Sequence, residues 1–481
     1  MKKITISKLF LYRYRFIIGY IILGLAFIAL LFLMPILAQN GLSDAEMQSA
    51  TESYYIGREK ILGGAIVDLP YHALQKLSIM LLGFSTYAIK LPSIIIGLVL
   101  GFLFILLLNR WFKSNVSLLA SCLVVLSTPF LYLAGSGTPL IMLIFWPTLM
   151  LWLGSKIEGE KRPKPLYSFM FTIVMLFSLF TPYMIYFAVF CIFFVLSQPH
   201  LRFIIKNLPK LPLAAVILIL LAGFTVISIG VYNHPETLME LFFAKDYDIN
   251  QFIPNLATGF APVFSWQKSL ENVFLSPLIS LPVFALSLIG LFSTTKGFFA
   301  SRNSIATILI VFCIVITGFN PSAMIFLILP FSILVAHGLK YLLEKWYGLF
   351  PENPYARVSA IIPLTILFGT MIIPSLLQYI YGYRYNPVVA DEFDYSLEIV
   401  KANVTSGDFL VTKNPNFYKI LEDFSEIKVI ENIESPAPRF ASLGKLTELP
   451  ANYTIERIIT SPLRENSDII YLYTYIEPQG E

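Results

Sequence analysis

Long stretches without a charged residue alternate with short polar segments along most of this chain. They cover residues 16–38, 91–109, 114–155, 165–201, 211–235, 272–295, 303–339 and 358–383. A helix needs about 20 apolar residues to cross a bilayer, so the shorter stretches predict one helix each and the three longest predict two. The three longest each contain turn-forming residues near the middle, at 135–139, 181–183 and 318–322. The pattern predicts an α-helical polytopic membrane protein with about 11 transmembrane helices.

Composition supports this class and excludes others. The chain of 481 residues is 57% hydrophobic and 13% charged, and its mean hydropathy is +0.73. An ordinary soluble domain is about 25% charged, so soluble, disordered and nucleic-acid-binding classes are excluded. All three cysteines lie in apolar stretches, which argues against a disulfide framework or a cysteine zinc site. The run 16–38 is longer than a signal-peptide core, and we expect it to be a retained helix.

The distribution of basic residues predicts the orientation. With the N-terminus in the cytoplasm, nineteen of the 34 Lys and Arg residues fall in inner segments, six in outer loops and nine in the C-terminal tail. Cytoplasmic loops carry an excess of Lys and Arg, so this arrangement is the expected one. The predicted location is therefore the cell membrane, with a cytoplasmic N-terminus and an extracytoplasmic C-terminus.

Three long segments are predicted to lie outside the membrane on the outer face. Two are loops, at 39–90 and about 233–271, within a transmembrane domain that covers 1–383. The third is the tail 384–481, which we expect to be a small soluble α/β domain with strands near 409–412, 427–430 and 469–475. The tail has neither a Gly-rich phosphate loop nor a nucleophile elbow, which favours a docking or substrate-shaping role.

The first outer loop carries two candidate catalytic acids. Asp44 and Glu46 follow the first apolar run directly, at the predicted outer surface. A carboxylate held at such a position can take a proton from an acceptor hydroxyl. Ser43 and Glu46 also fit the S-x-x-E capping box at the start of a helix, and the two interpretations are compatible.

The order of motifs in this loop resembles a known family. The acids are followed by a Pro-containing segment, a Leu-Gly pair and a Lys-Leu-Pro-Ser segment, at 69–72, 82–83 and 90–93. This order is similar to that of the GT-C integral-membrane glycosyltransferases, nearest to the branch of protein O-mannosyltransferases and the aminoarabinose transferase of lipid A. Two positions differ: Ala45 separates acids that are usually adjacent, and Lys90 replaces an Arg, which keeps the charge without the bidentate fork.

The resemblance implies a glycosyltransferase, for a hexose or a pentose, that moves a sugar from a polyprenyl-phosphate donor to an outer-face acceptor, which would be a protein, a lipid or a wall polymer. Asp44 is then the general base, or Glu46 if the register shifts by one position. The leaving phosphate needs cations. The candidate substrate-binding residues are His72, Lys76, Lys90 and Lys245, with Lys268 as a further outer lysine. Each lysine alone is also compatible with an ordinary solvated side chain.

Two further questions stay open at the level of sequence. In the second loop, His234, Asp246 and Asp248 make a divalent cation conceivable, but the rest of a calcium loop is missing and no metal ligand is assigned. The alternative functions are a lipid-linked substrate transporter or flippase and a non-catalytic membrane scaffold. A transporter would carry ionisable residues at mid-membrane, whereas the predicted spans have essentially none.

Overall fold

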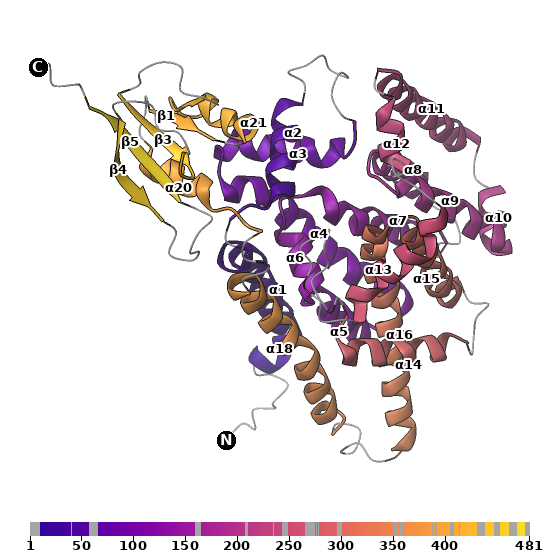
Figure 1. Ribbon diagram of the computed structural model, residues 1–481. Coiled ribbons are helices and arrows are strands. Elements are labelled where there is room, and N and C mark those ends of the chain that lie inside the picture. The colour runs from indigo at the N-terminus through magenta and orange to yellow at the C-terminus, as the bar shows by residue number, and fades with distance from the viewer. Residues whose placement is uncertain are drawn as a thin grey trace, which may run out of the picture.

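The computed structural model describes most of the chain. The described residues are 10–39, 41–56, 66–158, 165–206, 210–233, 235–242, 249–264, 275, 277, 279–295, 301–350, 352, 355, 359–386, 389, 392–404, 408–412, 414–430, 438–446, 453–460 and 469–476. Within them the chain forms a bundle of apolar helices with a small sheet domain at one end (Figure 1).

Every stretch predicted to span the membrane contains helix. The apolar helices are α1 (Phe10–Leu37), α4 (Thr86–Trp111), α5 (Ser114–Val125), α6 (Thr128–Gly135), α7 (Met142–Glu158), α8 (Pro165–Ser178), α9 (Met184–Ser197), α11 (Lys210–Asn233), α14 (Leu281–Thr295), α15 (Ser301–Phe319), α16 (Ile328–Leu349) and α18 (Ile361–Tyr385). The predicted breaks at 135–139, 181–183 and 318–322 lie between helices, and two of them lead into short 3-10 turns, η2 (Pro139–Ile141) and η4 (Pro321–Leu327). The helices thus break at or beside all three predicted turns.

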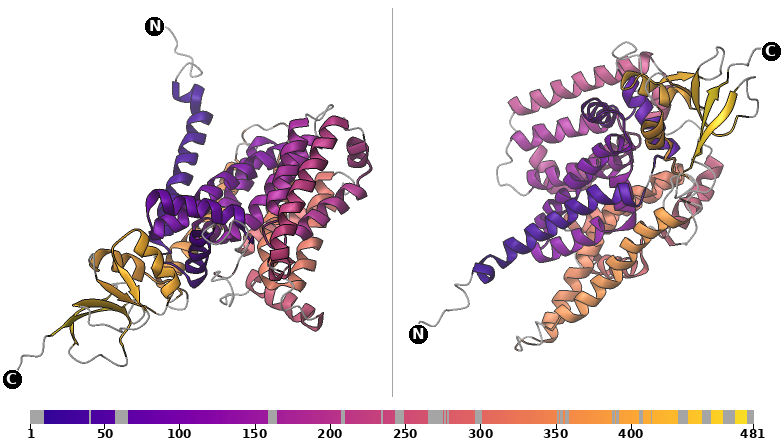
Figure 2. Two further views of the ribbon diagram at one scale, coloured as in Figure 1. Left: turned by 90° about the horizontal axis from the view of Figure 1, so that it is seen from above. Right: turned by 90° about the vertical axis from the view of Figure 1, so that its left-hand side faces the viewer.

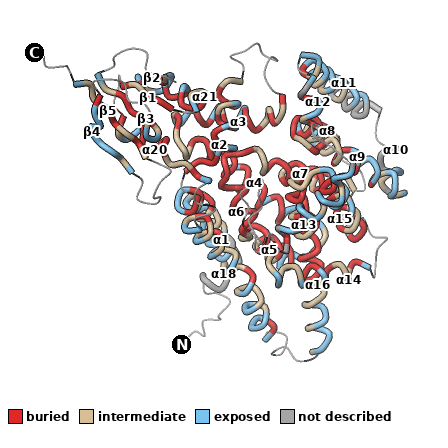
Figure 3. The backbone as a smooth tube through the Cα atoms, viewed as in Figure 1, coloured by how far each residue is buried: buried red, intermediate tan, exposed pale blue. Residues whose placement is uncertain are grey.

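The bundle is that of a multi-pass membrane protein. Among the described residues, four helical segments are long and apolar enough to cross a membrane: 86–111, 139–158, 321–349 and 361–385. A bent pair, α5 with α6, and six shorter apolar helices accompany them. The count of about 11 spans stays a prediction, because the described residues support four such segments, or five if the bent pair is one span. Leucine and isoleucine side chains of α1, α11 and α18 are exposed, as lipid-facing helices require (Figure 3).

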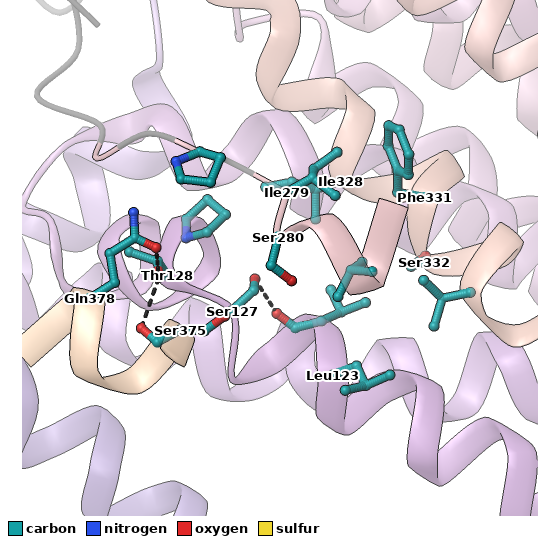
Figure 4. Close-up of a pocket in the computed structure, with 15 residues that line it drawn as sticks. Leu123, Ser127, Thr128, Ile279, Ser280, Ile328, Phe331, Ser332, Ser375 and Gln378 are labelled. Carbon is teal, nitrogen blue, oxygen red and sulfur yellow. Dashed lines mark hydrogen bonds between the residues drawn. The ribbon is translucent and has the colours of Figure 1, made fainter. Parts of the chain in front are cut away.

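The sequence pattern did not predict the bend between α5 and α6. The two helices meet at 66° around Leu126 and Ser127. Pro129 lies in the first turn of α6, where its missing N–H costs no helical hydrogen bond, and the Ser127 hydroxyl donates to the carbonyl of Val124 at 2.6 Å. The bend leaves a small cavity of about 50 Å³ beside α14, α16 and α18, with Ser127, Thr128 and Gln378 among its lining residues (Figure 4).

Two helices of the first loop, α2 (Asp44–Tyr55) and α3 (Leu69–Leu82), pack on each other and on the start of α4. The predicted capping box is present: Glu46 N–H donates to the Ser43 hydroxyl, and Ser43 N–H donates to the Glu46 carboxylate. On α3, Leu74, Leu77 and Leu81 are exposed while the opposite face is buried. The remaining short helices are α10 (Pro199–Lys206), α12 (Glu236–Phe242), η3 (Ile249–Gln251) and α13 (Phe252–Phe264).

The tail forms the predicted α/β domain. Its elements are α20 (Ser396–Asn403), β1 (Phe409–Val411), α21 (Pro415–Tyr418), η5 (Lys419–Asp423), β2 (Lys428–Ile430), β3 (Arg439–Leu443), β4 (Tyr453–Ile459) and β5 (Ile470–Tyr475). The sheet order is β2-β1-β3-β5-β4, with β1 parallel to β2 and β3, and β5 antiparallel to β3 and β4. The sequence pattern missed β3 and β4; β4 is an edge strand in which five of the seven residues are exposed, isoleucines among them, so no buried face marks it.

The tail domain packs on the first loop. Leu42, Met47 and Phe84 share one apolar cluster with Val400 and Phe417 of the tail. Leu42 and Asp394 form an antiparallel bridge, in which each N–H donates to the other's carbonyl at 2.8 and 2.7 Å. Figure 2 shows that α1 and α18 lead side by side toward this junction. The segment that follows α1 is therefore held by the segment that follows α18.

Candidate functional site

The Glu46 carboxylate is buried, with 1% of the residue exposed. One oxygen accepts the Ser43 N–H at 2.8 Å, and the other accepts the Gly137 N–H at 2.6 Å. The same second oxygen lies 3.7 Å from the Lys90 ammonium. Glu46 thus joins the start of α2, the turn after α6 and the first turns of α4, three segments that are far apart in sequence.

Lys90 is the buried partner of this acid. Only 2% of it is exposed, and its ammonium donates to the backbone carbonyl of Gln39 at 2.9 Å. The Phe393 ring lies over the ammonium, 5.6 Å from it to the ring centroid. The mutual attraction and the further hydrogen bonds of the two side chains offset the cost of taking a lysine and a carboxylate out of water together.

The two acids of the motif lie in different environments. Asp44 is exposed on the first turn of α2, and no partner for its side chain is found in the described part of the chain, whereas Glu46 is buried. Residues two apart on an α-helix are rotated by about 200°, so they point to nearly opposite sides. A helix that begins at residue 44 therefore separates the acids, one toward Lys90 and one toward solvent.

A hydrogen-bond network continues from Glu46 along the contact between α2 and α3. The Gln75 carbonyl oxygen accepts the hydroxyls of Ser49 at 2.9 Å and Ser53 at 2.6 Å. The Gln75 amide nitrogen donates to the carbonyls of Gly137 at 2.8 Å and Ile89 at 3.0 Å. The turn after α6 is therefore fixed from both sides, by Glu46 at its N–H and by Gln75 at its carbonyl.

His72 belongs to this network. Its Nδ1 lies 2.7 Å from the Ser53 hydroxyl, and its Nε2 lies 3.5 Å from the Glu52 carboxylate. Burial lowers the pKa of His72 to about 4 and raises the pKa of Glu52. His72 is thus neutral near pH 7, and both ring nitrogens face protein groups, an arrangement suited to holding α2 against α3.

Lys76 is not brought to this pair. The ammonium of half-buried Lys76 donates to the carbonyl of Ile56, at the end of α2. Lys245 and Lys268 lie outside the described residues, as do His234, Asp246 and Asp248. In the part of the chain that the structure describes, no group of three or more His, Cys, Asp or Glu residues could hold a metal ion.

The structure adds residues that the sequence analysis did not single out. Gln39 supplies the carbonyl that binds Lys90, and Gly137 supplies the N–H that binds Glu46. Asp68, which precedes α3, is a non-glycine residue in the left-handed region with φ 53°, and burial raises its pKa to about 7. The Asp-Leu-Pro segment is itself a helix-start signal, whereas the roles of Gln39 and Gly137 depend on tertiary contacts.

Comparisons with known proteins give matches in sequence and in fold. Residues 70–227 match the model of the dolichyl-phosphate-mannose-protein mannosyltransferase family. The fold is similar to that of ArnT from Cupriavidus metallidurans in the apo state, at TM-score 0.56 and 12% identity over 95% of this chain and 98% of that one. The structure of the same protein bound to undecaprenyl phosphate is similar at TM-score 0.52 and 10% identity, over 94% of this chain and 98% of that one.

An oligosaccharyltransferase from Archaeoglobus fulgidus, in complex with Zn and sulfate, is similar at TM-score 0.53 and 12% identity, over 85% of this chain and 61% of that one. No curated protein matches the sequence. The comparisons confirm the resemblance to the GT-C integral-membrane glycosyltransferases, and the chain has that fold. Within the class, the mannosyltransferase family model covers the segment that contains Lys90 and Gly137.

Proposed function

We propose that this protein transfers a sugar from a polyprenyl-phosphate donor to an acceptor at the outer face of the membrane. The observation that carries the proposal is the buried Glu46–Lys90 pair at the exit of α1, in a chain with the fold of lipid-phosphate-dependent glycosyltransferases. The bundle supplies a bilayer-embedded route for a lipid donor. The tail and first loop supply the side on which an acceptor meets the donor head group.

Asp44 acts as the general base in the proposed reaction. Its exposure supports this role, because a hydroxyl arriving from the aqueous side reaches Asp44 without displacing a protein contact. The acceptor oxygen attacks the anomeric carbon with inversion, its proton passes to Asp44, and the bond from that carbon to the phosphate oxygen breaks. Glu46, whose two oxygens already accept backbone N–H groups, acts as a positioning residue for Lys90.

Lys90 stabilises the leaving polyprenyl phosphate as negative charge develops on it. A cation fixed in a dry site stabilises such charge more strongly than one in water. Burial of Lys90 and its anchoring to the Gln39 carbonyl support this role. Lys245 is proposed as a further substrate-binding residue. Lys76 and His72, proposed from sequence for the same role, act instead as positioning residues for α2.

The test is a sugar-transfer assay in membranes with Asp44→Asn and Asp44→Glu. We expect Asp44→Asn to lower kcat by 100-fold or more with an unchanged melting temperature, because general-base catalysis contributes about 10²–10⁴. Asp44→Glu keeps a carboxylate and should restore part of the rate. Glu426→Gln, at an exposed carboxylate of the tail, is the matched control and should be fully active.

Wild-type activity in both Asp44→Asn and the double variant with Glu46→Gln would remove the proposed base. Loss of transfer in Glu46→Gln alone, with Asp44→Asn active, would move the base to Glu46. Absence of transfer by the wild-type protein from every polyprenyl-phosphate hexose and pentose would refute the enzyme assignment.

A further inference from the structure

Two fully buried side chains beside the Glu46–Lys90 pair have unused hydrogen-bonding groups. Gln39 and Tyr379 are each 0% exposed. Within the described residues, neither the oxygen nor the nitrogen of the Gln39 side-chain amide has a hydrogen-bond partner, and the Tyr379 hydroxyl has none either. Buried polar groups in proteins are nearly always paired, so a cluster of three unpaired ones requires a reason.

The unpaired groups are neighbours. A Cβ placed on Gly135 would lie 3.0 Å from the Tyr379 hydroxyl oxygen and 3.1 Å from the Gln39 amide oxygen. The side chains of α18 and of the α1 exit therefore converge on the end of α6, where a glycine leaves space for both. The backbone of the same Gln39 binds Lys90, and Glu46 is close enough to interact electrostatically with Tyr379. The cluster thus adjoins the proposed reaction site.

Packing alone does not explain these residue types. A leucine in place of Gln39 and a phenylalanine in place of Tyr379 would fill similar volumes and bring no buried polar group that costs free energy. The neighbouring α2–α3 contact satisfies its own buried polar groups: Gln75 uses both ends of its amide in four hydrogen bonds. The contrast indicates that Gln39 and Tyr379 are kept for a partner that is not part of the protein.

The chemistry of the unpaired groups indicates what that partner is. An amide offers a donor and an acceptor, and a phenol hydroxyl offers both. A phosphate accepts hydrogen bonds only, so it would leave the acceptor oxygen of the Gln39 amide unpaired. Neutral hydroxyl groups, which donate and accept, match the set. The Tyr383 ring packs against the Tyr379 ring at 5.4 Å between centroids and stacks on the Tyr132 ring at 5.0 Å.

We infer that Gln39 and Tyr379 bind hydroxyl groups of the transferred sugar and so determine which donor is used. This inference rests on the proposed function. Lys90 then meets the phosphate of the donor while Gln39 and Tyr379 meet its sugar ring. Gly135 suits this arrangement, since a side chain there would crowd both groups.

The experiment measures binding, independently of transfer, by thermal shift with polyprenyl phosphate alone and with polyprenyl phosphates carrying a hexose or a pentose. We expect wild type to bind one sugar-bearing lipid about 10-fold more tightly than the bare lipid. Tyr379→Phe and Gln39→Leu should lose this gain while their binding of the bare lipid is unchanged. Tyr381→Phe, at a 57% exposed tyrosine of the same helix, is the matched control and should keep the gain.

The melting temperature is a second measurement. It distinguishes a sugar-binding role of the Tyr379 hydroxyl from a purely structural one, because the two roles predict opposite changes. Without ligand, Tyr379→Phe should melt at the same temperature as wild type or higher, because the variant buries one unpaired group fewer. A lower melting temperature would mean that the hydroxyl is bonded within the fold and would overturn the inference. Retention of the sugar-dependent gain in both variants, or its absence in wild type, would also overturn it. Either result leaves the transfer assay on Asp44 as a separate test of the proposed function.

Discussion

The α2–α3 contact and the α1–α18 contact both adjoin the Glu46–Lys90 pair, yet they differ in how their buried polar groups are satisfied. In the first, Ser49, Ser53, His72 and Gln75 bond to one another and to backbone. In the second, Gln39 and Tyr379 have polar atoms that find no partner among the described residues. A satisfied network rigidifies its surroundings, whereas unsatisfied groups destabilise the unliganded protein. The comparison separates residues that hold the site from residues that meet the substrate.

The largest effect on stability is expected at the buried Glu46–Lys90 pair. Lys90→Met leaves the buried Glu46 carboxylate without its cation and should destabilise the protein by about 3–5 kcal/mol. The measurement is the thermal unfolding midpoint in detergent. The double variant with Glu46→Gln removes both charges and should recover part of the loss. Equal stability of Lys90→Met and wild type would show that the pair does not hold the site.

An intermediate, pH-dependent effect is expected at Asp68, a buried carboxyl near the same network. Its pKa is about 7 in the folded protein against an ordinary 3.8, because burial disfavours the charged form. Between these values only the unfolded chain releases the proton, so the stability contributed at low pH is lost as the pH rises through about 7. The full change is on the order of 4 kcal/mol.

Asp68→Asn removes this titration and tolerates the left-handed backbone. Its stability relative to wild type should therefore rise between pH 4 and 7.5, as measured by melting curves at each pH. The lowered pKa of His72 acts in the opposite sense, with stability lost as the pH falls toward about 4, but it is common to both proteins and cancels in the difference. A flat difference across this range would contradict the assignment.

The smallest effect is expected at the serines bonded to Gln75. Ser49→Ala leaves the Gln75 oxygen bonded to Ser53, so it should cost about 0.5–1.5 kcal/mol and leave transfer unchanged. Ser53→Ala also removes the partner of His72 and should cost more. Melting temperatures of the two variants give the comparison directly. A larger loss from Ser49→Ala than from Ser53→Ala would argue against the network as described.

Much of the fold could be predicted because lipid-facing helices must be apolar along their length. The hairpin breaks, the capping box at Ser43 and three of the five tail strands followed from local pattern. The bend at Ser127 was missed because its residues read as one apolar run. The cluster of Gln39 with Tyr379 joins positions 340 residues apart, and no local pattern encodes such a contact.

The candidate site was also predicted only in part, because local motifs reveal some of its residues and tertiary contacts supply the others. Glu46 and Lys90 stand in short motifs near each end of one loop, and the structure brings them within 3.7 Å of each other. Their shared partner Gly137 lies in a turn that sequence identified only as a hairpin break. Lys76 was grouped with Lys90 because both are cationic residues of the first loop. The sequence alone does not reveal that the long side chain of Lys76 binds the carbonyl of Ile56.

The bridge between Leu42 and Asp394 has a consequence for biosynthesis. Gly41 adopts φ +115°, and any Cβ there would collide with the Asp394 carbonyl, so the two strands fit only as a matched pair. A ribosome delivers residue 394 long after the first helix has entered the membrane. The acid-bearing loop therefore acquires its final conformation only after residue 394 has been synthesised, and a nascent chain that stops before this residue lacks the bridge that holds the loop.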